Sequence, residues 1–280
     1  MNFLFLYKKT HGSVRNTIVI ALLFSVLLFK DRIQMMSYNI EPISSFSQAE
    51  DVLISLDQNA LVIFDVDDTL LLSNDPTFQE RNVKSLSFAA LAANLYFWYP
   101  QFRNSAFRYD IANQAMLESD RILIEPLVTN LIESLLARKI KVIALTRMAL
   151  KNSDAIANVM EWRYQDLLSH NINFDESFPE LGPCCLSSDH INGPEFHKGI
   201  IKCGKMNKGR ALECFLESAK FRPSQIILFD NTARNLATVG YSAQKLGIDY
   251  HGFLYEGSDQ YPNNFNIRTA YREIEALVSK

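Results

Sequence analysis

The sequence has little of what marks a fibrous, disordered or disulfide-stapled protein. Its 280 residues include only 10 glycines and 9 prolines, and 48% of them are hydrophobic, which excludes a collagen-like fibre, a disordered tail and a low-complexity scaffold. Four cysteines are too few for a disulfide framework. The formal net charge of -3 lacks the basic excess of a general nucleic-acid-binding protein. An ordinary globular chain remains, long enough for one large domain or for a core with inserts.

Long apolar runs are also absent, apart from one near the start of the chain. Residues 17–29 (TIVIALLFSVLLF) carry no charge and follow three basic residues. As a helix, this run would measure roughly 20 Å, less than the ~30 Å hydrocarbon core of a bilayer. A basic start followed by about 7–15 apolar residues is typical of a secretory signal. We therefore expect residues 1–36 to be a signal or membrane-anchor segment that directs export to the periplasm or the medium.

Three other interpretations of this segment stay open. No small-residue cleavage site follows before Glu41, so residues 17–29 could remain in contact with the membrane as an uncleaved anchor. The run could also be a buried helix. If translation starts at Met35 or Met36, the segment is absent and the protein is cytoplasmic.

After this segment, strand and helix patterns alternate along the chain. Short apolar runs with β-branched residues predict buried strands, at 60–64, 140–145, 226–229 and 248–255. Apolar residues at helical spacing predict helices, at 125–136, 208–220, from 230 to 243, and 267–280. This alternation predicts an α/β fold with a Rossmann-like core of three layers, in which helices cover both faces of a parallel sheet.

Two long stretches interrupt the alternation. Residues 74–120 are mostly helix-like and rich in aromatic residues, whereas residues 150–205 start as a helix and continue with many Pro, Gly, Asn and Cys residues. We therefore predict a catalytic core of residues 45–73 and 121–280, a helical cap insert at 74–120, and a second insert at 150–205. The aromatic residues between 96 and 109 are either the insert's own core or the lining of a pocket for an apolar leaving group.

Polar residues follow three of the predicted strands directly. They are Asp65 and Asp67 after the first strand, Thr146 after the second, and Asp230 and Asn231 after the third. In an open parallel sheet, reactive groups gather at the carboxyl ends of the strands. One carboxylate there can act as a nucleophile, and a second beside it can act as general acid and then as base. Because neighbouring carboxylates repel each other and offer only oxygen ligands, this pattern predicts a Mg²⁺ site.

Four segments carry a family resemblance. In chain order they are LVIFDVDDTL from Leu61, KVIALT up to Thr146, MNKGRALECFL around Lys208, and IILFDNTARNL up to Leu236. Together they resemble the motifs of the haloacid dehalogenase (HAD) superfamily, in its phosphatase branch with an aspartate nucleophile. The layout also resembles a little-characterised bacterial group of secreted HAD-like proteins.

The resemblance implies a catalytic role for each matching residue. Asp65 would be the nucleophile that forms an aspartyl-phosphate, and Asp67 would protonate the leaving oxygen and later activate the attacking water. Thr146 would hydrogen-bond the phosphoryl group, and Lys208 would neutralise its charge. Arg147 directly follows Thr146 and is a further candidate for phosphate contact.

The resemblance also implies a set of metal ligands. Mg²⁺ would be held by Asp65, by the backbone carbonyl of Asp67 and by Asp230. Asn231 departs from the family pattern, which often has a second aspartate there, and would be a weaker ligand.

Several nearby residues compete for these roles or for others. Lys198, Lys202 and Lys205 are alternatives to Lys208, which we prefer because an amphipathic helix starts there. Three arginines are expected on the solvated surface, namely Arg103, Arg108 and Arg121. Five residues fit no zinc spacing, namely Cys184, Cys185, His190, His197 and Cys203, and in an exported protein Cys203 or Cys214 could instead join a disulfide.

These patterns predict a Mg²⁺-dependent phosphomonoester hydrolase. Its substrate would be a phosphorylated small molecule or a phosphoprotein, and we expect no nucleic-acid partner. Two alternatives stay open: a catalytically silent HAD-like module that binds a partner, and a phosphotransferase that uses the same aspartyl-phosphate. The joint presence of Asp65 and Asp67 favours an enzyme over a silent module.

Overall fold

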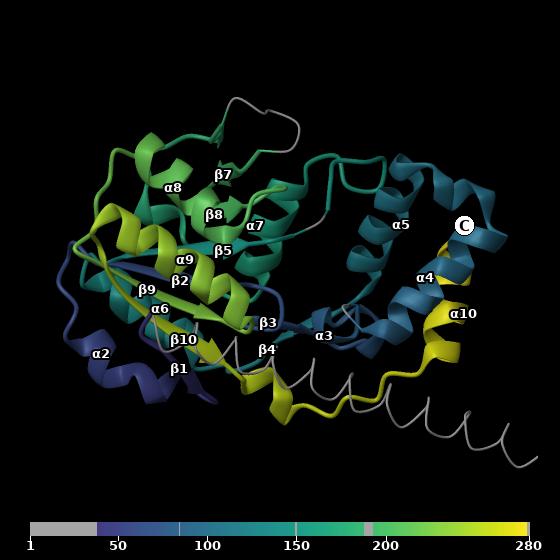
Figure 1. Ribbon diagram of the computed structural model, residues 1–280, viewed down its shortest axis with the longest axis horizontal. Coiled ribbons are helices and arrows are strands. Elements are labelled where there is room, and N and C mark those ends of the chain that lie inside the picture. Colours follow the sequence, from purple (N-terminus) through teal and green to yellow (C-terminus); the bar gives the residue numbers. More distant parts are fainter. Residues whose placement is uncertain (1–37, 84, 149, 188–192, 279–280) are drawn as a thin grey trace, which may run out of the picture.

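A computed structural model of the chain describes residues 38–83, 85–148, 150–187 and 193–278. The expected leader, residues 1–36 with its apolar run at 17–29, lies outside the described residues. In the described ranges we find no helix with the length and apolarity needed to cross a bilayer. Figure 1 shows a sheet with its covering helices and, beside it, a separate group of helices formed by α4, α5 and α10.

The core is built on a mostly parallel sheet with the strand order β1-β10-β9-β2-β5-β8-β7-β6. Neighbouring strands run parallel across β1, β10, β9, β2, β5 and β8. Strands β7 and β6 then continue the sheet, and each pairs antiparallel with the strand before it. The strand bounds are β1 Ile40–Ile43, β2 Leu61–Phe64, β5 Lys141–Thr146, β6 Cys184–Cys185, β7 Glu195–His197, β8 Ile200–Lys202, β9 Gln225–Asp230 and β10 Asp249–Tyr255.

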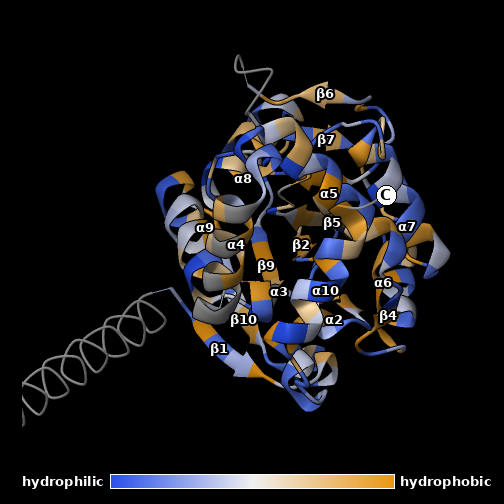
Figure 2. Cartoon of the chain, turned by 90° about the vertical axis from the view of Figure 1, so that its right-hand side faces the viewer, coloured by the Kyte–Doolittle hydropathy of each residue, from blue (hydrophilic) through white to orange (hydrophobic). Residues whose placement is uncertain are grey.

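Strand β2 shows why this sheet has helices on both faces. Its four residues are all fully buried, because alternate side chains enter two different hydrophobic clusters. Val62 and Phe64 pack under the first layer of helices, and Leu61 and Ile63 pack under the second. In Figure 2 the central strands β2 and β9 accordingly take the colour of hydrophobic residues.

The two helical layers account for most of the remaining core elements. The first consists of α2 (Glu50–Ile54), α6 (Val128–Ala137) and α7 (Val159–Ser169), and the second of α8 (Lys208–Ser218) and α9 (Ala233–Leu246). Short 3₁₀ helices lie at Phe46–Ala49, Asp175–Ser177 and Gly257–Gln260. The prediction of a three-layer α/β core of Rossmann type is confirmed.

The cap insert leaves and re-enters the core through a small sheet of its own. Strand β3 (Leu71–Ser73) pairs antiparallel with β4 (Arg121–Leu123), and residues 74–120 lie between them in the chain. This stretch contains the 3₁₀ helices Pro76–Phe78 and Pro100–Arg103 and the helices α3 (Glu80–Val83), α4 (Leu86–Trp98) and α5 (Ser105–Glu118). The described part of the insert is therefore mostly helical, and its two connections to the core lie side by side.

The C-terminal helix corrects one predicted boundary. Helix α10 (Ile267–Val278) packs against α4 and α5, and its buried Ala270, Ile274 and Leu277 share a hydrophobic cluster with them. It therefore belongs to the cap, although residues 121–280 were all assigned to the core. Among the aromatic residues at 96–109, Tyr99, Phe102 and Phe107 lie in the same cluster, so they are the insert's own core.

The prediction of a second insert at 150–205 is wrong for its helix and its last strands. Helix α7 is part of the first helical layer, and β8 pairs with β5 in the main sheet. Strand β8 has only three residues, too few to show a strand pattern in the sequence. These residues therefore extend the core.

Candidate active site

A tight turn after β2 carries the first motif. The N–H of Asp65 donates to the carbonyl of Phe229 at 2.9 Å, so the sheet continues one residue past β2. The N–H groups of Leu70 and Leu71 both donate to the carbonyl of Val66 at 2.9 Å, which closes a turn. Asp68 has a φ of 58° in this turn, a conformation that aspartate tolerates better than most residues. The turn holds Asp65 and Asp67 at the carboxyl edge of the sheet.

Lys208 lies between two carboxylates. Its Nζ is 2.7 Å from Oδ1 of Asp65 and 2.6 Å from Oδ2 of Asp230, and the lysine side chain is fully buried. Burial by itself disfavours the charged ammonium, but the carboxylates of Asp230 and Asp65 outweigh it and raise the pKa of Lys208. The lysine is therefore charged and joins the ends of β2 and β9.

The position of Lys208 follows from local helix chemistry. Helix α8 begins at Lys208, and the side chain of Asn207 caps it by accepting from the N–H of Arg210 at 2.8 Å. Gly209 follows, and a Cβ there would overlap the backbone carbonyl of Thr238 in α9. The glycine thus lets α8 approach α9 closely, with Lys208 directed at the strand ends.

Asp230 is held from both sides. Its Oδ1 accepts from the N–H of Thr232 at 2.8 Å and from Nδ2 of Asn235 at 3.0 Å, and the residue is fully buried. Asn231 is half-buried, and its Oδ1 accepts from Oγ1 of Thr232 at 3.1 Å. The N–H of Asn231 donates to Oγ1 of Thr69 at 3.2 Å. The fourth and first motifs are thereby connected.

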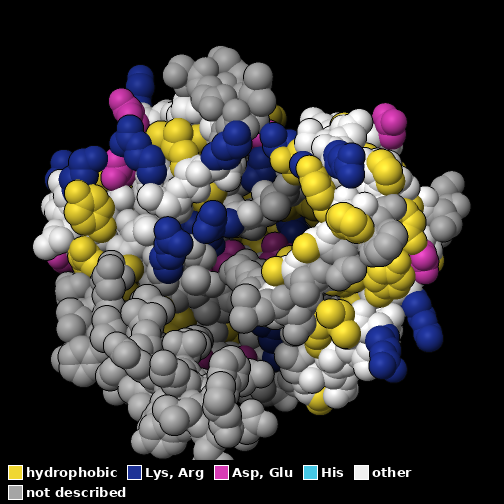
Figure 3. Space-filling model, turned by 45° about the vertical axis from the view of Figure 1, so that its right-hand side comes forward, with side chains coloured by type: hydrophobic (Ala, Val, Ile, Leu, Met, Phe, Trp, Pro, Cys, Tyr) yellow, Lys and Arg dark blue, Asp and Glu magenta, His cyan; other side chains and the backbone are white. Residues whose placement is uncertain are grey.

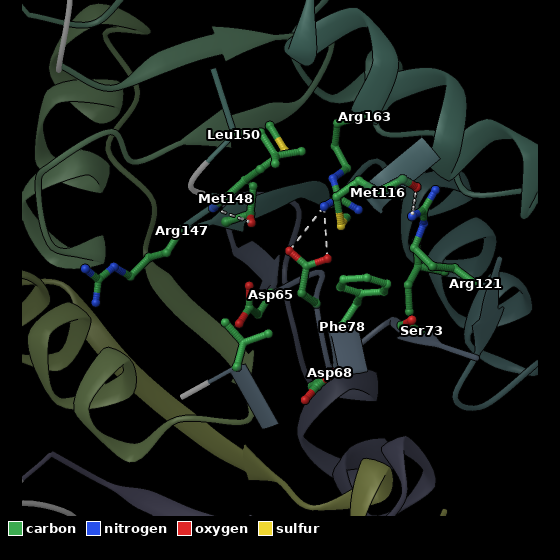
Figure 4. A pocket seen from close by; sticks show the side chains of 14 residues that line it. Asp65, Asp68, Ser73, Phe78, Met116, Arg121, Arg147, Met148, Leu150 and Arg163 are labelled. Atoms are coloured by element: carbon green, nitrogen blue, oxygen red, sulfur yellow. Dashed lines mark hydrogen bonds and ion pairs between the residues drawn. The ribbon is translucent and has the colours of Figure 1, made fainter. Parts of the chain in front are cut away.

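Thr146 and Arg147 at the end of β5 are placed differently. Thr146 is buried beside the cavity described below, and its Oγ1 accepts from the N–H of Met148 at 3.1 Å. Arg147 is exposed, and Figure 4 shows its side chain pointing away from Asp65. Both residues thus line the cavity, but only Thr146 faces it with its functional group, because the guanidinium of Arg147 points away from Asp65.

Asp67 has a cationic partner. Nη2 of Arg163 in α7 lies 2.9 Å from Oδ1 and 3.2 Å from Oδ2 of Asp67 (Figure 4). Nη1 of the same arginine donates to Asp166 at 2.9 Å, and Asp166 also accepts from Arg121 at 2.8 Å. Burial disfavours the charged guanidinium of Arg163, but Asp67 and Asp166 outweigh it and raise its pKa.

This network was not predicted from the sequence. Arg121 was expected on the solvated surface, but its side chain is only 11% exposed, so that expectation is wrong. The signal in the sequence was the spacing of Arg163 and Asp166 by three residues on one helix, which is equally typical of a solvated helix face.

A cavity of about 380 Å³ opens between the core and the cap. The core contributes polar groups, namely Asp65, Asp67, Asp68, Thr146 and Arg163. Most of the other lining side chains are apolar, namely Leu71, Phe78, Val83, Met116, Met148 and Leu150. Figure 3 shows acidic side chains at the bottom of a hollow with apolar ones around it. Lys208 and Asp230 lie behind Asp65 and are not part of the lining.

The donor set fits Mg²⁺ in its chemistry. Asp65, Asp230 and Asn231 offer only oxygen, and two of these side chains are carboxylates held close together by one ammonium. The carboxylate of Asp67 faces Arg163, so its contribution would come from the backbone carbonyl. Within the described ranges no three His, Cys, Asp or Glu side chains are grouped tightly enough to form a metal site by themselves.

The competing lysines and the cysteines lie elsewhere. Lys202 pairs with Glu195 at 2.6 Å, Lys198 pairs with Glu161 at 3.4 Å, and Lys205 is exposed. The four cysteines are free thiols, with Cys203 and Cys214 buried and the adjacent pair Cys184 and Cys185 more exposed. Burial raises the pKa of Cys203 to about 12.

The sheet topology defines an α/β protein with a three-layer, Rossmann-type core. The chain belongs to the family described as "Protein of unknown function (DUF2608)", whose family model matches residues 40–279.

The individual relatives share only about a quarter of their aligned residues with this chain. An uncharacterized protein of Rickettsia prowazekii is 23% identical over 254 residues, which cover 89% of this chain and 87% of the relative. A Chlamydia muridarum protein, whose name proposes an outer membrane location, is 24% identical over 246 residues and 82% of each chain. Among solved structures, the HAD domain of effector protein Lem4 from Legionella pneumophila, an inactive mutant, has a TM-score of 0.36 and 15% identity, with 79% of this chain and 96% of that chain covered.

Proposed function

We propose that the protein is a Mg²⁺-dependent phosphomonoester hydrolase with Asp65 as its nucleophile. The observation that supports this most directly is the position of Asp65. Its carboxylate faces a cavity of about 380 Å³, its Oδ1 is 2.7 Å from the buried ammonium of Lys208, and Asp67 lines the same cavity. A nucleophile, a second carboxylate and a buried cation are the groups that phosphoryl transfer through an aspartyl ester needs.

The proposed reaction has two steps. In the first, an Asp65 oxygen attacks phosphorus, the bond from phosphorus to the ester oxygen breaks, and Asp67 gives its proton to the leaving alcohol. In the second, Asp67 takes a proton from water, whose oxygen attacks phosphorus, so that inorganic phosphate leaves and the Asp65 carboxylate is restored. Thr146 would donate a hydrogen bond to the phosphoryl group. Arg147 would have to turn toward the cavity to contact it.

The ions of the site would share the charge of the phosphoryl group. Lys208 stays charged between Asp65 and Asp230 and supplies one positive charge behind the nucleophile. When bound by Asp65, the carbonyl of Asp67, Asp230 and Asn231, Mg²⁺ would supply the additional neutralisation that a dianionic phosphate requires.

The substrate would be a phosphorylated small molecule or a phosphoprotein. The apolar side chains around the cavity suit a leaving group with an apolar portion. The net charge of -3 gives no support to a nucleic-acid partner. The N-terminal apolar run and the outer membrane name of the Chlamydia muridarum relative support export, with residues 17–29 as signal or membrane contact.

The direct test is hydrolysis of p-nitrophenyl phosphate with and without Mg²⁺. We expect the wild type to be active only with Mg²⁺, and Asp65→Asn to lose activity by roughly 10³-fold or more, because the variant lacks the nucleophile. Asp249→Asn is the matched control, since Asp249 is exposed at the start of β10, and it should retain full activity. An inactive wild type or an active Asp65→Asn variant contradicts the proposal.

One observation favours a catalytically silent module as the second candidate. Lys208 already pairs with both Asp65 and Asp230, and Arg163 pairs with Asp67, so each of the three carboxylates has a cationic partner without a metal. Thermal unfolding with increasing Mg²⁺ separates the two candidates. A metal site raises stability with concentration, by about 2.7 kcal/mol at 100 times the dissociation constant, and Asp230→Asn should abolish the rise. A silent module shows no such rise.

A phosphotransferase would instead be recognised by phosphorylated products when alcohol acceptors are added.

A further inference from the structure

Four side chains form a continuous ionic chain from the cavity to the exit of the cap insert. In order they are Asp67, Arg163, Asp166 and Arg121. Arg163 bridges the two aspartates, with Nη2 at 2.9 Å from Asp67 and Nη1 at 2.9 Å from Asp166. Oδ1 of Asp166 accepts from Nε of Arg121 at 2.8 Å, and Nη2 of Arg121 lies at the same distance. The carboxylate assigned to proton transfer is thus connected to β4 through three charged groups.

Burial makes the ionic chain rigid. The Arg163 side chain is fully buried, and those of Asp166 and Arg121 are nearly so, whereas Asp67 at the cavity is 32% exposed. The guanidiniums of Arg121 and Arg163 also lie 4.9 Å and 5.0 Å from the ring centroid of Trp162. Buried charges are costly unless each is paired, and here two guanidiniums face two carboxyl groups, of which Asp67 is ionised between the two chemical steps and Asp166 throughout. Each member therefore fixes the position of the next.

Two further contacts fix the segments that carry the ionic chain. Glu161, two residues before Arg163 in the first turn of α7, lies 2.7 Å from Nε2 of His197 in β7. Hydrogen bonds from Gln165 and His197 lower the pKa of Glu161 to about 2, so this anchor is charged over the usual pH range. At the other end, Nη1 of Arg121 donates to the backbone carbonyl of Met116 in α5 at 2.9 Å. The ionic chain thus reaches from the last helix of the insert to Asp67.

We propose that Arg163 is a positioning residue for Asp67, and that Asp166 and Arg121 tie this position to the cap helix α5. This inference rests on the proposed function, in which Asp67 gives a proton to the leaving group and later takes one from water. Arg163 itself passes no proton in this scheme. It holds the Asp67 carboxylate at the cavity wall. The ion pair with Asp166 keeps the guanidinium of Arg163 in place, so that it cannot move together with Asp67.

The two chemical steps depend differently on a well-placed Asp67. p-Nitrophenolate is a good leaving group and departs without a proton, whereas an alkyl alcohol needs one. Attack by water needs Asp67 as a base for either substrate. Displacing Asp67 should therefore leave the first step of p-nitrophenyl phosphate hydrolysis intact and slow every other step.

The experiment compares p-nitrophenyl phosphate with glycerol phosphate in rapid-mixing kinetics, with Mg²⁺ present. For Arg163→Met we expect a burst of one p-nitrophenol per protein at nearly the wild-type rate, followed by turnover about 10²–10³-fold slower. Glycerol phosphate hydrolysis should fall by the same factor with no burst. Arg163→Lys keeps the charge but cannot bridge both aspartates, and should recover about a tenth of the lost rate.

Two further variants keep the test decisive. If Arg163→Met does not fold, Asp166→Asn keeps the shape of the side chain and removes the group that holds Arg163 from behind; it should give the same burst with smaller losses. Arg210→Gln, which removes the ion pair with Glu213 away from the cavity, should behave like the wild type. Equal losses in burst and turnover, or no loss in either, overturn the positioning role alone. A wild type that hydrolyses neither substrate overturns the proposed function and this inference with it.

Discussion

The ammonium group of Lys208 has no exposed surface and touches the carboxylate of Asp65, directly after β2, and that of Asp230, the last residue of β9. A lysine in that position loses all of its hydration, so it is tolerated only because Asp65 and Asp230 are paired with it. The dependence is mutual, since Asp230 is also fully buried. At the scale of single residues, the ends of two strands are therefore held together by one positive charge.

The first prediction concerns the removal of this charge. Lys208→Met leaves two buried carboxylates without their cation, and we expect a loss of about 3–5 kcal/mol in unfolding free energy, together with loss of phosphatase activity. Urea unfolding at about pH 8 measures the first effect. Lys245→Met is the matched control, because Lys245 is 52% exposed beside Glu213 and its loss should cost at most ~1 kcal/mol. Equal costs for the two variants would contradict the argument.

The pH dependence of the same variant has a defined sign. The pKa of Lys208 is raised in the folded protein, so its contribution to stability is fully present below its unfolded value of about 10.4 and is lost as pH rises through the folded value. The stability difference between wild type and Lys208→Met should therefore begin to shrink only above about pH 10. A decline that starts near neutral pH would show that another group carries the effect.

Single residues of the site could be predicted where the chemistry lies next to a strand pattern. Asp65, Thr146 and Asp230 each follow a buried apolar run, and the parallel sheet brings such ends together. The partnership of Asp67 and Arg163 could not be predicted in this way. The two residues are 96 positions apart, and only the packing of α7 under the sheet makes them neighbours. Local sequence patterns predict helices and strands, but they do not predict which helix packs against which part of the sheet.

At the scale of elements, the close crossing of α8 and α9 sets where Lys208 lies. At Gly209 the backbone of α9 leaves no room for a Cβ. The N–H of Gly209 also faces Oγ1 of Thr238 at 3.4 Å. A glycine in a helix is normally less favourable than alanine by about 1 kcal/mol. Here the close packing of α8 against α9, which only glycine permits, offsets this difference.

The second prediction follows from this crossing. Gly209→Ala gains helix propensity but forces α8 away from α9, and overpacking of this kind costs about 1–3 kcal/mol. We expect a net loss of stability and, because Lys208 is the adjacent residue, a loss of activity larger than the stability change explains. Gly182→Ala is the control, since a Cβ at Gly182 meets nothing within 4 Å. A Gly209→Ala variant more stable than wild type would show that helix propensity dominates.

Element patterns in the sequence succeeded for long, fully buried strands and failed for short ones. Strands β5 and β9 have six residues each and were recognised by their apolar runs. Strand β8 has three, and β1 has four with two exposed side chains in the middle. Neither shows a period that distinguishes a strand from a loop. Their pairing is decided by the neighbouring strand, which is a tertiary effect.

At the scale of the whole molecule, the cap is connected to the core by three chain passages instead of two. The insert leaves after β3 and returns at β4, and the chain crosses again between β10 and α10. Helix α10 is hydrogen-bonded to the insert, since Oγ1 of Thr77 donates to Glu273 at 2.5 Å. Thr77 precedes Phe78, a residue of the cavity wall. The C-terminal helix therefore supports the wall of the cavity from outside, a role the sequence did not indicate because α10 comes after the last core strand in the chain.

The last prediction tests whether this cap is a cooperative unit of its own. Ile274 of α10 is buried in a hydrophobic cluster that α10 shares with α4 and α5 and that is separate from the two core clusters. Ile274→Ala should cost about 2–5 kcal/mol at this site, and hydrogen exchange should show lost protection in α4, α5 and α10 while β2, β5 and β9 keep theirs. Ile132→Ala in α6, buried in the first core cluster, is the matched control and should lower the protection of the core strands. Uniform loss over core and cap in Ile274→Ala would show that the molecule unfolds as one unit, and that α10 supports the cavity wall only through global stability.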